Sequence, residues 1–230
     1  MKKLLLSILI FNTFVTHSNA QESEDEIKLD EIEILSSPRI EIKSSQNSIS
    51  VVSISREEIQ NSTATNLSEL LQQIAGIDIR RRGVEGMQAD LYIRGGSFDQ
   101  TLLLIDGMKV EDPQTGHHTM NMTLPLEVIE KIEIIKGAAS RIYGQNAFTG
   151  AINIITKKDI ENNISLNLIG GSFDQKRAEV TMQRKLKNSD LLINYNRKES
   201  EGYRYNTDFE NDEFFIKSNF KIKGRNISAI

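Results

Sequence analysis

The last third of the chain alternates apolar and polar residues, and this pattern constrains the fold more than any other feature. The first such segment reads ISLNL at residues 164–168, and others follow at 193–196 and 214–223. Because neighbouring side chains of a strand point to opposite faces, each segment predicts a long strand with one apolar face. Such strands form a sandwich with one dry face or a membrane barrel that turns its apolar face to lipid. Segments of roughly ten residues with tyrosines and phenylalanines near their ends favour the barrel.

Short strands and short helices alternate before residue 158, which indicates one α+β domain. A helix is expected to begin at Arg56, because Ser55 and Glu58 form a capping box. Asn66 is the expected N-cap of a second helix, and Gly76 its left-handed C′ residue. Strands are expected at residues 49–54, 77–80, 90–94, 101–105, 131–136 and 151–156.

One tight turn and two short helical segments complete this expected domain. Asp106-Gly107 is typical of a tight hairpin turn. Pro125 is expected at the first position of a helical turn, because its fixed φ and missing N–H suit that position. A short helix is expected in AASRIYG, residues 138–144, with Gly144 as its stop.

The first twenty residues predict a secretory signal peptide. Lys2 and Lys3 precede a short apolar run at residues 4–15, and Ser18-Asn19-Ala20 supplies small residues for cleavage after Ala20. An acidic tether is expected to follow, up to residue 40.

The tether contains LDEIEILSSPR at residues 29–39, where Ile32 and Ile34 alternate with glutamates. A stretch of this kind can add itself as a strand to the sheet edge of a partner. It can also be an edge strand of the chain's own domain. The composition alone favours this second interpretation.

His117 and His118 stand side by side in DPQTGHHTMN, residues 112–121, and raise the question of a reaction centre. Adjacent residues of an extended chain point to opposite faces, so they chelate a metal poorly. The chain has three histidines and no cysteine, and it lacks a G-x-S-x-G elbow and a phosphate-binding glycine loop. We therefore predict no catalytic residue, no metal and no cofactor, with a metal-dependent enzyme as the competing interpretation. A ligand-contact loop and a solvated loop both remain open.

Three further features carry less information. Arg80 to Arg82 can attract an anionic ligand or form a solvated positive turn. The hexapeptide GGSFDQ occurs at residues 95–100 and 170–175, and we interpret both copies as turns. The formal net charge of −4 argues against a nucleic-acid partner, which favours basic surfaces.

Three segments together resemble the plug domain of TonB-dependent outer-membrane receptors. They are NLSELLQQIAGIDI, LYIRGGSFDQTLLLIDGMKVED and LEVIEKIEIIKGAASRIYGQNAFTGAINIITK, at residues 66–79, 91–112 and 126–157. LDEIEILSSPR stands where that family carries its TonB box, and the later strands resemble the start of its barrel. Ala138 departs from the proline that is common there in the family. The motifs look most like the cobalamin-receptor branch.

The resemblance implies an α+β plug domain followed by the first antiparallel strands of a transmembrane β-barrel, with the barrel incomplete in this chain. Such receptors are barrels of about 22 strands with a plugged lumen. It implies active import across the outer membrane of a scarce small chelate, with cobalamin or another corrinoid ahead of a siderophore or haem. Expected partners are a TonB-type energy-coupling protein, outer-membrane lipids, the chelate and, as a further candidate, a surface lipoprotein. The receptor makes and breaks no bond, so no enzyme is expected.

The expected domains are a signal peptide at 1–20, a tether with TonB box at 21–40, a plug at 41–158 and part of a barrel at 159–230. Four or five strands cannot close a barrel, so the chain is expected to be a fragment or the product of a truncated gene. The short tether leads us to expect transport without a signalling domain. A soluble periplasmic plug-like binding module and a non-functional truncated receptor are the alternatives.

The resemblance also implies roles for individual residues. The TonB box is expected at Asp30, Glu31, Ile32, Glu33, Ile34, Leu35 and Ser36. Ligand contacts are expected from three loops of the plug apex, at Arg82, Glu85, Gln88, Phe98, Asp99, Gln114, His117, His118 and Asn121. Ion pairs that dock the plug in the barrel are expected from Arg94, Glu130, Glu133 and Arg141.

Overall fold

A computed structural model describes most of the chain from residue 33 onward. The described residues are 33–37, 40–43, 51–85, 87–112, 114–117, 119–121, 124–222 and 225–230. Among them, no helix is both long enough and apolar enough to cross a membrane.

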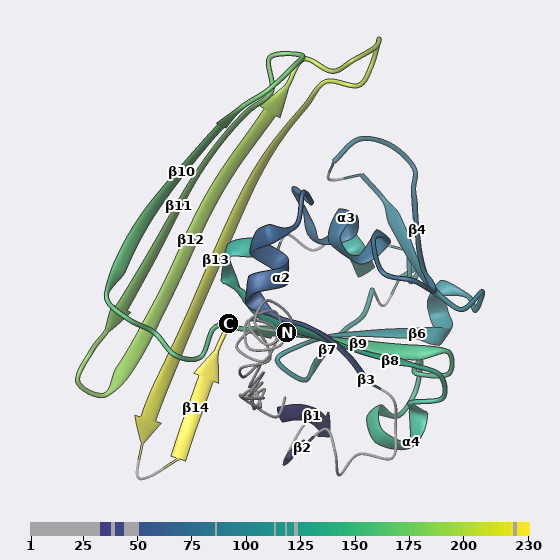
Figure 1. The fold of residues 1–230 in the computed structure, drawn as a ribbon, viewed down its shortest axis with the longest axis vertical. Coiled ribbons are helices and arrows are strands. Elements are labelled where there is room, and N and C mark those ends of the chain that lie inside the picture. Colours follow the sequence, from purple (N-terminus) through teal and green to yellow (C-terminus); the bar gives the residue numbers. More distant parts are fainter. Residues whose placement is uncertain are drawn as a thin grey trace, which may run out of the picture. The chain divides into compact units, whose positions relative to one another are not determined.

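A five-stranded sheet forms the centre of the first domain, which we call the plug (Figure 1). Its strand order is β3-β8-β9-β6-β7, and only the β6–β9 pair is parallel. The strands are β3 (Val51–Ile54), β6 (Thr101–Ile105), β7 (Met108–Val110), β8 (Ile129–Lys136) and β9 (Gly150–Thr156). The mixture of this sheet with short helices confirms the predicted α+β domain.

A separate hairpin and, among the described residues, six short helical segments complete the plug. The hairpin pairs β4 (Ile77–Arg81) with β5 (Ala89–Ile93). The α-helices are α2 (Arg56–Asn61), α3 (Leu67–Gln72) and α4 (Ser140–Tyr143). The 3-10 helices are η2 (Phe98–Gln100), η3 (Thr119–Asn121) and η4 (Leu126–Val128).

Side-chain caps set the helix starts as predicted. The Ser55 side chain accepts a hydrogen bond from the Glu58 N–H, and Glu58 accepts one from the Ser55 N–H. Asn66 likewise accepts from the Glu69 N–H at the start of α3. These bonds satisfy amide groups that the first helical turn leaves without partners.

Two predictions about helix ends were wrong in detail. Helix α3 stops at Gln72, so Gly76, whose φ is +82°, lies in the turn into β4 and is not the C′ residue. Pro125 precedes η4 as its N-cap with an extended ψ of 139°, one position earlier than predicted. Its fixed φ suits both positions, so the ring alone did not decide between them.

The plug core lies between the central sheet and the two longer helices. Strand β9 is buried along its whole length, and Ile132 and Ile134 of β8 are fully covered. Leu70 and Leu71 of α3 join the same cluster. Burying one such side chain contributes about 1.5–3 kcal/mol, so this cluster is the main source of plug stability.

The remaining strands form a second, antiparallel five-stranded sheet, which we call the wall sheet. Its order follows the chain: β10 (Asn163–Gly170), β11 (Lys176–Lys185), β12 (Ser189–Ser200), β13 (Phe209–Ile222) and β14 (Arg225–Ala229). A short turn at residues 186–188 joins β11 to β12, and a longer loop at 201–208 joins β12 to β13. The plug followed by these strands confirms the predicted fold class.

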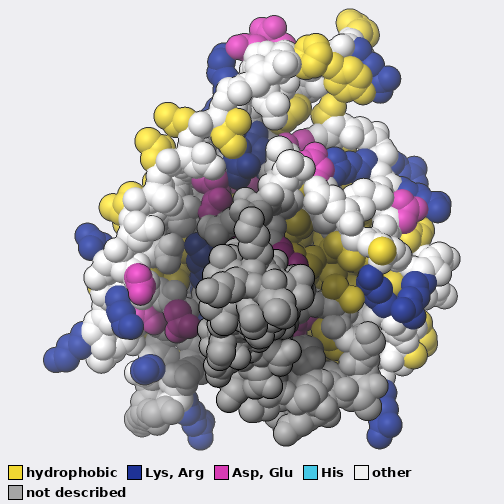
Figure 2. All heavy atoms as spheres, viewed as in Figure 1, with side chains coloured by type: hydrophobic (Ala, Val, Ile, Leu, Met, Phe, Trp, Pro, Cys, Tyr) yellow, Lys and Arg dark blue, Asp and Glu magenta, His cyan; other side chains and the backbone are white. Residues whose placement is uncertain are grey.

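The two faces of the wall sheet differ in polarity. Val180, Tyr195 and Phe214 are cross-strand partners on one face, and each is more than 40 % exposed. Thr181 and Asn194 are partners on the opposite face and are buried. Figure 2 shows apolar side chains protruding at the outer side of this sheet. An exposed apolar face opposite a polar one is typical of a membrane barrel wall.

Strands β1 (Glu33–Ser37) and β2 (Ile40–Lys43) pair with each other in a two-stranded antiparallel sheet. The predicted TonB box overlaps β1 at residues 33–36, and Asp30, Glu31 and Ile32 lie outside the described residues. In the described part of the chain, β1 pairs with one neighbour, which leaves its second edge for another strand.

Candidate ligand-binding cluster and plug–wall contacts

A buried carboxylate organises the loops in which ligand contacts were predicted. Asp90 is the second residue of β5 in the β4–β5 hairpin and is 3 % exposed. His117 Nδ1 lies 3.0 Å from Asp90 Oδ1, and Gln88 Nε2 donates to the same oxygen at 3.4 Å. Arg82 Nη2 lies 3.7 Å from Oδ2. We call Asp90, Arg82, Gln88, Phe98 and His117 the Asp90 cluster.

Phe98 of η2 covers one side of the His117 ring. The two ring centroids are 4.1 Å apart with planes tilted by 35°. Gly116 allows this approach: its φ is +74°, and a Cβ there would lie 2.6 Å from Asp99 Oδ1. A larger residue at 116 would therefore separate the histidine loop from η2.

The loop before His117 is shaped by its own polar groups. Asp112 accepts hydrogen bonds from the backbone N–H groups of Gln114 and Thr115 and from the Thr115 hydroxyl. Such local side-chain to backbone bonds define a compact turn. The turn therefore presents His117 in one orientation.

The predicted ligand residues do not all meet. Arg82, Gln88, Phe98 and His117 lie in the Asp90 cluster, and Asp99 lies beside Gly116. Gln114 is exposed, and Asn121 lies in η3. His118 lies outside the described residues. Glu85 faces the wall sheet instead, as the next contact shows.

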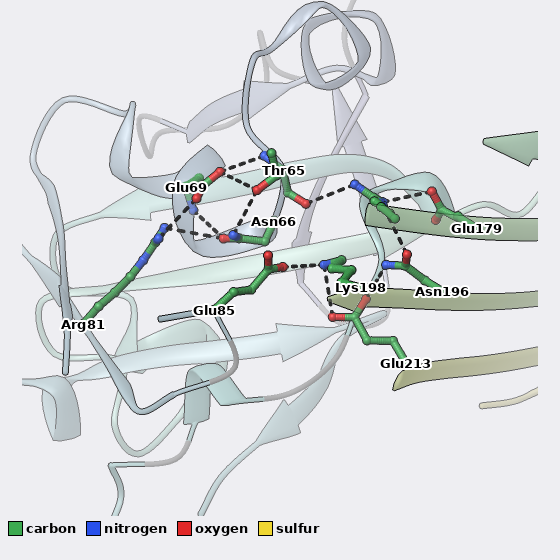
Figure 3. A network of polar contacts seen from close by, with 10 residues as sticks. Thr65, Asn66, Glu69, Arg81, Glu85, Glu179, Asn196, Lys198 and Glu213 are labelled. Atoms are coloured by element: carbon green, nitrogen blue, oxygen red, sulfur yellow. Dashed lines mark hydrogen bonds and ion pairs between the residues drawn. The ribbon is translucent and has the colours of Figure 1, made fainter. Parts of the chain in front are cut away.

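Lys198 of β12 joins the β4–β5 loop to the wall sheet (Figure 3). Its ammonium group pairs with Glu85 and, at 3.3 Å, with Glu213 Oε1 of β13. The side chains of all three residues are at most 14 % exposed. Asn196 donates a further bond of 2.8 Å to Glu213. Because burying an unpaired charge costs free energy, this pairing stabilises the contact between the loop and the wall sheet.

Arg177 of β11, the cross-strand partner of Lys198, contacts the start of α3. Its Nη1 donates to the Thr65 carbonyl oxygen at 3.3 Å, and its Nη2 pairs with Glu179 at 2.9 Å. The Thr65 N–H and hydroxyl in turn donate to Glu69. Burial raises the pKa of Glu69, but these two bonds and Arg81 outweigh it, so the pKa lies below its ordinary value.

Lys217 of β13 makes the second ion pair between plug and wall. Its Nζ lies 2.8 Å from Asp106 Oδ2 and donates to Thr156 Oγ1 at 2.6 Å. Asp106 also accepts from the Thr156 N–H and hydroxyl. Asp106 has a φ of +49° in the predicted tight turn, but sequence analysis assigned it no role beyond that turn.

A small cavity lies beside the Lys198 contact. Its lining includes Asn66, Met87, Leu124 and Glu213, and its volume is about 60 Å³. Sites for drug-sized ligands are roughly 300–1,000 Å³. The cavity therefore holds water-sized molecules and does not compete with the Asp90 cluster as a chelate site.

The four predicted docking residues are placed elsewhere. Arg94, Glu130 and Arg141 are exposed, and the buried Glu133 pairs with Lys131 of its own strand at 2.9 Å. The described polar contacts from plug to wall come from Thr65, Glu85, Asp106 and Thr156. Docking by the four predicted residues stays a prediction. Sequence reasoning missed Asp90 and Asp106, because each partner is more than 25 residues away or belongs to the wall sheet.

No group of three or more histidine, cysteine or acidic side chains in the described residues is arranged to hold a metal ion. The Asp90 cluster has one histidine and one buried acid. Its polar groups are one imidazole, one buried carboxylate, one guanidinium and one side-chain amide.

Comparisons with known proteins agree with this architecture. Residues 41–151 match the family described as TonB-dependent Receptor Plug Domain. The Vitamin B12 transporter BtuB of Vibrio cholerae is 34 % identical over 159 residues, which are 68 % of this chain and 25 % of that protein. BtuB of Vibrio vulnificus is 30 % identical over 195 residues, 84 % of this chain and 31 % of that protein. The chain thus spans about a quarter to a third of these relatives.

Solved structures share the fold at low sequence identity. The pyoverdine receptor FpvA of Pseudomonas aeruginosa superposes with a TM-score of 0.69 at 18 % identity, covering 83 % of this chain and 28 % of FpvA. The alcaligin receptor FauA of Bordetella pertussis gives 0.66 at 15 % identity, covering 83 % and 32 %. The plug match, the related sequences and the shared fold together show that this chain belongs to the TonB-dependent receptors of the outer membrane, whose plug domain and barrel strands it carries.

Proposed function

We propose that the chain is the plug and first barrel strands, residues 41–158 and 159–230, of an active importer of cobalamin or another corrinoid. The observation that carries the ligand class is the 34 % and 30 % identity to two proteins named vitamin B12 transporters. The siderophore receptors share the fold at 15–18 % identity, which supports the architecture and not their ligands.

Polar contacts between plug and wall fit a transport role. Two buried lysines hold the plug to the wall sheet through Glu85 and Asp106. Ion pairs and hydrogen bonds have defined geometry, so a small displacement of the plug weakens them. A large apolar interface would resist the separation of plug and wall more strongly. Arg94, Glu130, Glu133 and Arg141 are proposed to dock against barrel strands beyond those described.

Energy coupling is proposed to enter through the β1 segment. A strand with one unpaired edge can accept a partner strand by main-chain hydrogen bonds. Residues 30–36 are proposed as this TonB box, and a TonB-type protein as the partner.

Uptake of radiolabelled cobalamin by cells that carry the gene tests the ligand class. Deletion of the gene should abolish TonB-dependent uptake, and its return should restore it. Ferric siderophores and haemin serve as parallel substrates. Unchanged cobalamin uptake in the deletion strain would refute the corrinoid assignment.

Ile34→Pro tests the coupling segment, because proline removes the backbone N–H that strand addition needs. This variant should bind cobalamin normally on whole cells and lose its uptake. Ile34→Val, which keeps the N–H and the strand preference, is the matched control. Uptake by the proline variant at the level of the valine variant would remove residue 34 from the coupling strand.

A further inference from the structure

We propose that Lys217 of the wall sheet is a transit site for an anionic group of the ligand. At rest its ammonium group binds the plug carboxylate of Asp106, and once the plug has moved it binds a phosphodiester of the ligand. This inference rests on the proposed import function and deepens it, because it defines the ligand as a corrinoid with a negatively charged tail. Ion pairs and hydrogen bonds are exchanged, and no covalent bond changes.

Lys217 lies on the face of the wall sheet that the plug covers. Its side chain is 3 % exposed, and its cross-strand partner Leu192 belongs to the core cluster of the plug. In a membrane barrel the polar face of each strand lines the lumen. A ligand that enters the lumen after the plug has moved therefore meets this ammonium group.

The plug supplies the partners of the Lys217 ammonium group in the described part of the chain. Nζ lies 2.8 Å from Asp106 Oδ2 and donates to Thr156 Oγ1 at 2.6 Å. The nearest acid of the wall in the strand register is Asp190, opposite Asn219, and the described residues contain no ion pair between it and Lys217. Displacement of the plug thus leaves this lysine without a counter-charge. Because an unpaired charge held away from bulk water costs free energy, the site then favours an incoming anion.

Lys198 has a different arrangement. It pairs with Glu85 of the plug and also with Glu213 of β13 at 3.3 Å, so it keeps an acid of the wall when the plug loop leaves (Figure 3). Asn196 holds Glu213 with a further bond of 2.8 Å. The wall therefore neutralises Lys198 by itself, whereas Lys217 depends on the plug. This difference identifies Lys217 as the cation that becomes available during transport.

The plug group that pairs with Lys217 resembles the proposed ligand group in its chemistry. A carboxylate and a phosphodiester each carry one negative charge on two terminal oxygens, and both accept hydrogen bonds from an ammonium group. The N–H and hydroxyl of Thr156 donate to the Asp106 carboxylate at 2.8 and 2.6 Å. These bonds fix Asp106 to its own domain, so its carboxylate leaves with the plug and a ligand anion can take its place.

Such an exchange selects among corrinoids by charge. Cobalamin carries a nucleotide tail joined through a phosphodiester, whereas cobinamide has the same corrin ring and lacks the nucleotide and its phosphate. We therefore expect Lys217 to speed the passage of cobalamin and to have no comparable effect on cobinamide.

Uptake of radiolabelled cobalamin and cobinamide by energised cells tests the transit site. The double variant Asp106→Asn with Lys217→Met removes the wall cation and leaves no unpaired charge in the contact. The ratio of the cobalamin to the cobinamide uptake rate should fall roughly tenfold, the usual contribution of one hydrogen bond to a charged group. Binding of cobalamin to de-energised cells should match that of the parent, which also shows that the receptor is assembled.

Two further variants separate ligand recognition from plug docking. Lys217→Arg keeps the cation and should keep the parent ratio. Glu85→Gln removes an ion pair between plug and wall but leaves Lys198 with Glu213, and it should also keep the parent ratio. Equal losses of both corrinoids in the double variant would reduce Lys217 to a docking residue and overturn the proposal. If cobinamide is not imported, equal cobalamin uptake by the double variant and Lys217→Arg would overturn it.

These outcomes are separable from those of the import proposal. A parent strain that takes up neither corrinoid refutes import, and the transit site falls with it. A parent strain that imports cobalamin, together with a double variant that imports it at the parent rate, leaves import standing and removes the transit site.

Discussion

The plug and the wall sheet bury opposite kinds of side chain. In the plug, Leu103 and Ile134 are fully covered, and β9 is buried along its length. In the wall sheet, Leu168 is 68 % and Phe214 62 % exposed, while the polar face is covered. The plug is thus organised for water and the wall for lipid, because each buries the groups that its own surroundings exclude.

This inversion explains how the plug is held. The wall presents mainly polar and charged groups to the plug, so ion pairs and hydrogen bonds join the two, and Leu192 and Phe215 of the wall add apolar contact to the plug core cluster. The ion pairs lie at two levels of the sheet, since Lys198 pairs with the β4–β5 loop and Lys217, opposite Leu192 in the register, pairs with the turn at Asp106. Six residues of β12 separate the two levels, which is about 20 Å.

Truncation of one leucine in each region should show the inversion directly. Leu103→Ala in β6 should lower the free energy of unfolding by about 2–5 kcal/mol, because it leaves a cavity. Leu168→Ala in β10 should change it by less than about 0.5 kcal/mol, as exposed sites usually do. Urea unfolding in detergent, followed by far-ultraviolet circular dichroism because the chain has no tryptophan, measures both. Equal losses would contradict the inversion.

Removal of Lys217, the more buried of the two lysines, should loosen the contact between plug and wall. Lys217→Met leaves Asp106 beside the wall without its cation and should cost about 3 kcal/mol. Hydrogen exchange of the β6–β7 turn should accelerate with it. The double variant Asp106→Asn with Lys217→Met should be closer to the parent protein than the single lysine variant, since no unpaired charge remains. Purely additive losses would show that the two groups do not interact.

The Lys198 contact with Glu85 should be weaker than the Lys217 contact, and its effects should be more local. Glu85→Gln keeps the side-chain shape, and Lys198 retains Glu213, so the loss should be about 1 kcal/mol. Faster exchange should be confined to the β4–β5 loop, where the Arg82 N–H donates to the Gln88 carbonyl. Glu57→Gln on exposed α2 is the matched control. Exchange that also accelerates around Asp106 would show that the two levels release together.

The smallest expected effect is a pH dependence from Glu69. Its folded-state pKa is lowered, so its carboxylate stabilises the fold above the ordinary pKa of a glutamate. That contribution is lost as the pH falls through the lowered folded-state value. The melting-temperature difference between the parent and Glu69→Gln should therefore be constant above pH 6 and shrink in acid. A difference that is the same at pH 7 and pH 3 would exclude this role.

Features with local causes were predictable from sequence. The capping residues of α2 and α3, the Asp106-Gly107 turn and the alternation in the wall strands all depend on residues within a few positions of one another. The candidate site was only partly predictable. Four of its residues were named in advance. Asp90 was not, because in the sequence it is a single polar residue in the strand ADLYI and its partner His117 is 27 positions away.

The repeated hexapeptide shows where local reasoning ends. GGSFDQ forms the 3-10 helix η2 at its first occurrence, whereas Phe173 and Asp174 of the second copy have positive φ values in the β10–β11 turn. Both copies contain the predicted turn, since the Gly96 N–H donates to the Ile93 carbonyl oxygen in the first copy. The first copy also continues into η2, where Phe98 packs on His117. Identical residues adopt both forms because the flanking strands and the packing partners differ.

The sequence by itself determined the strand alternation, the helix starts, the tight turn and the family resemblance, because these follow from side-chain period and from short-range hydrogen bonds. Only the tertiary structure decided that Glu85 faces a lysine of the wall, that Asp106 anchors the plug, and that a buried Asp90 orients His117. Those choices depend on which distant groups become neighbours when water is excluded, since a buried charge must find a partner wherever the fold places one.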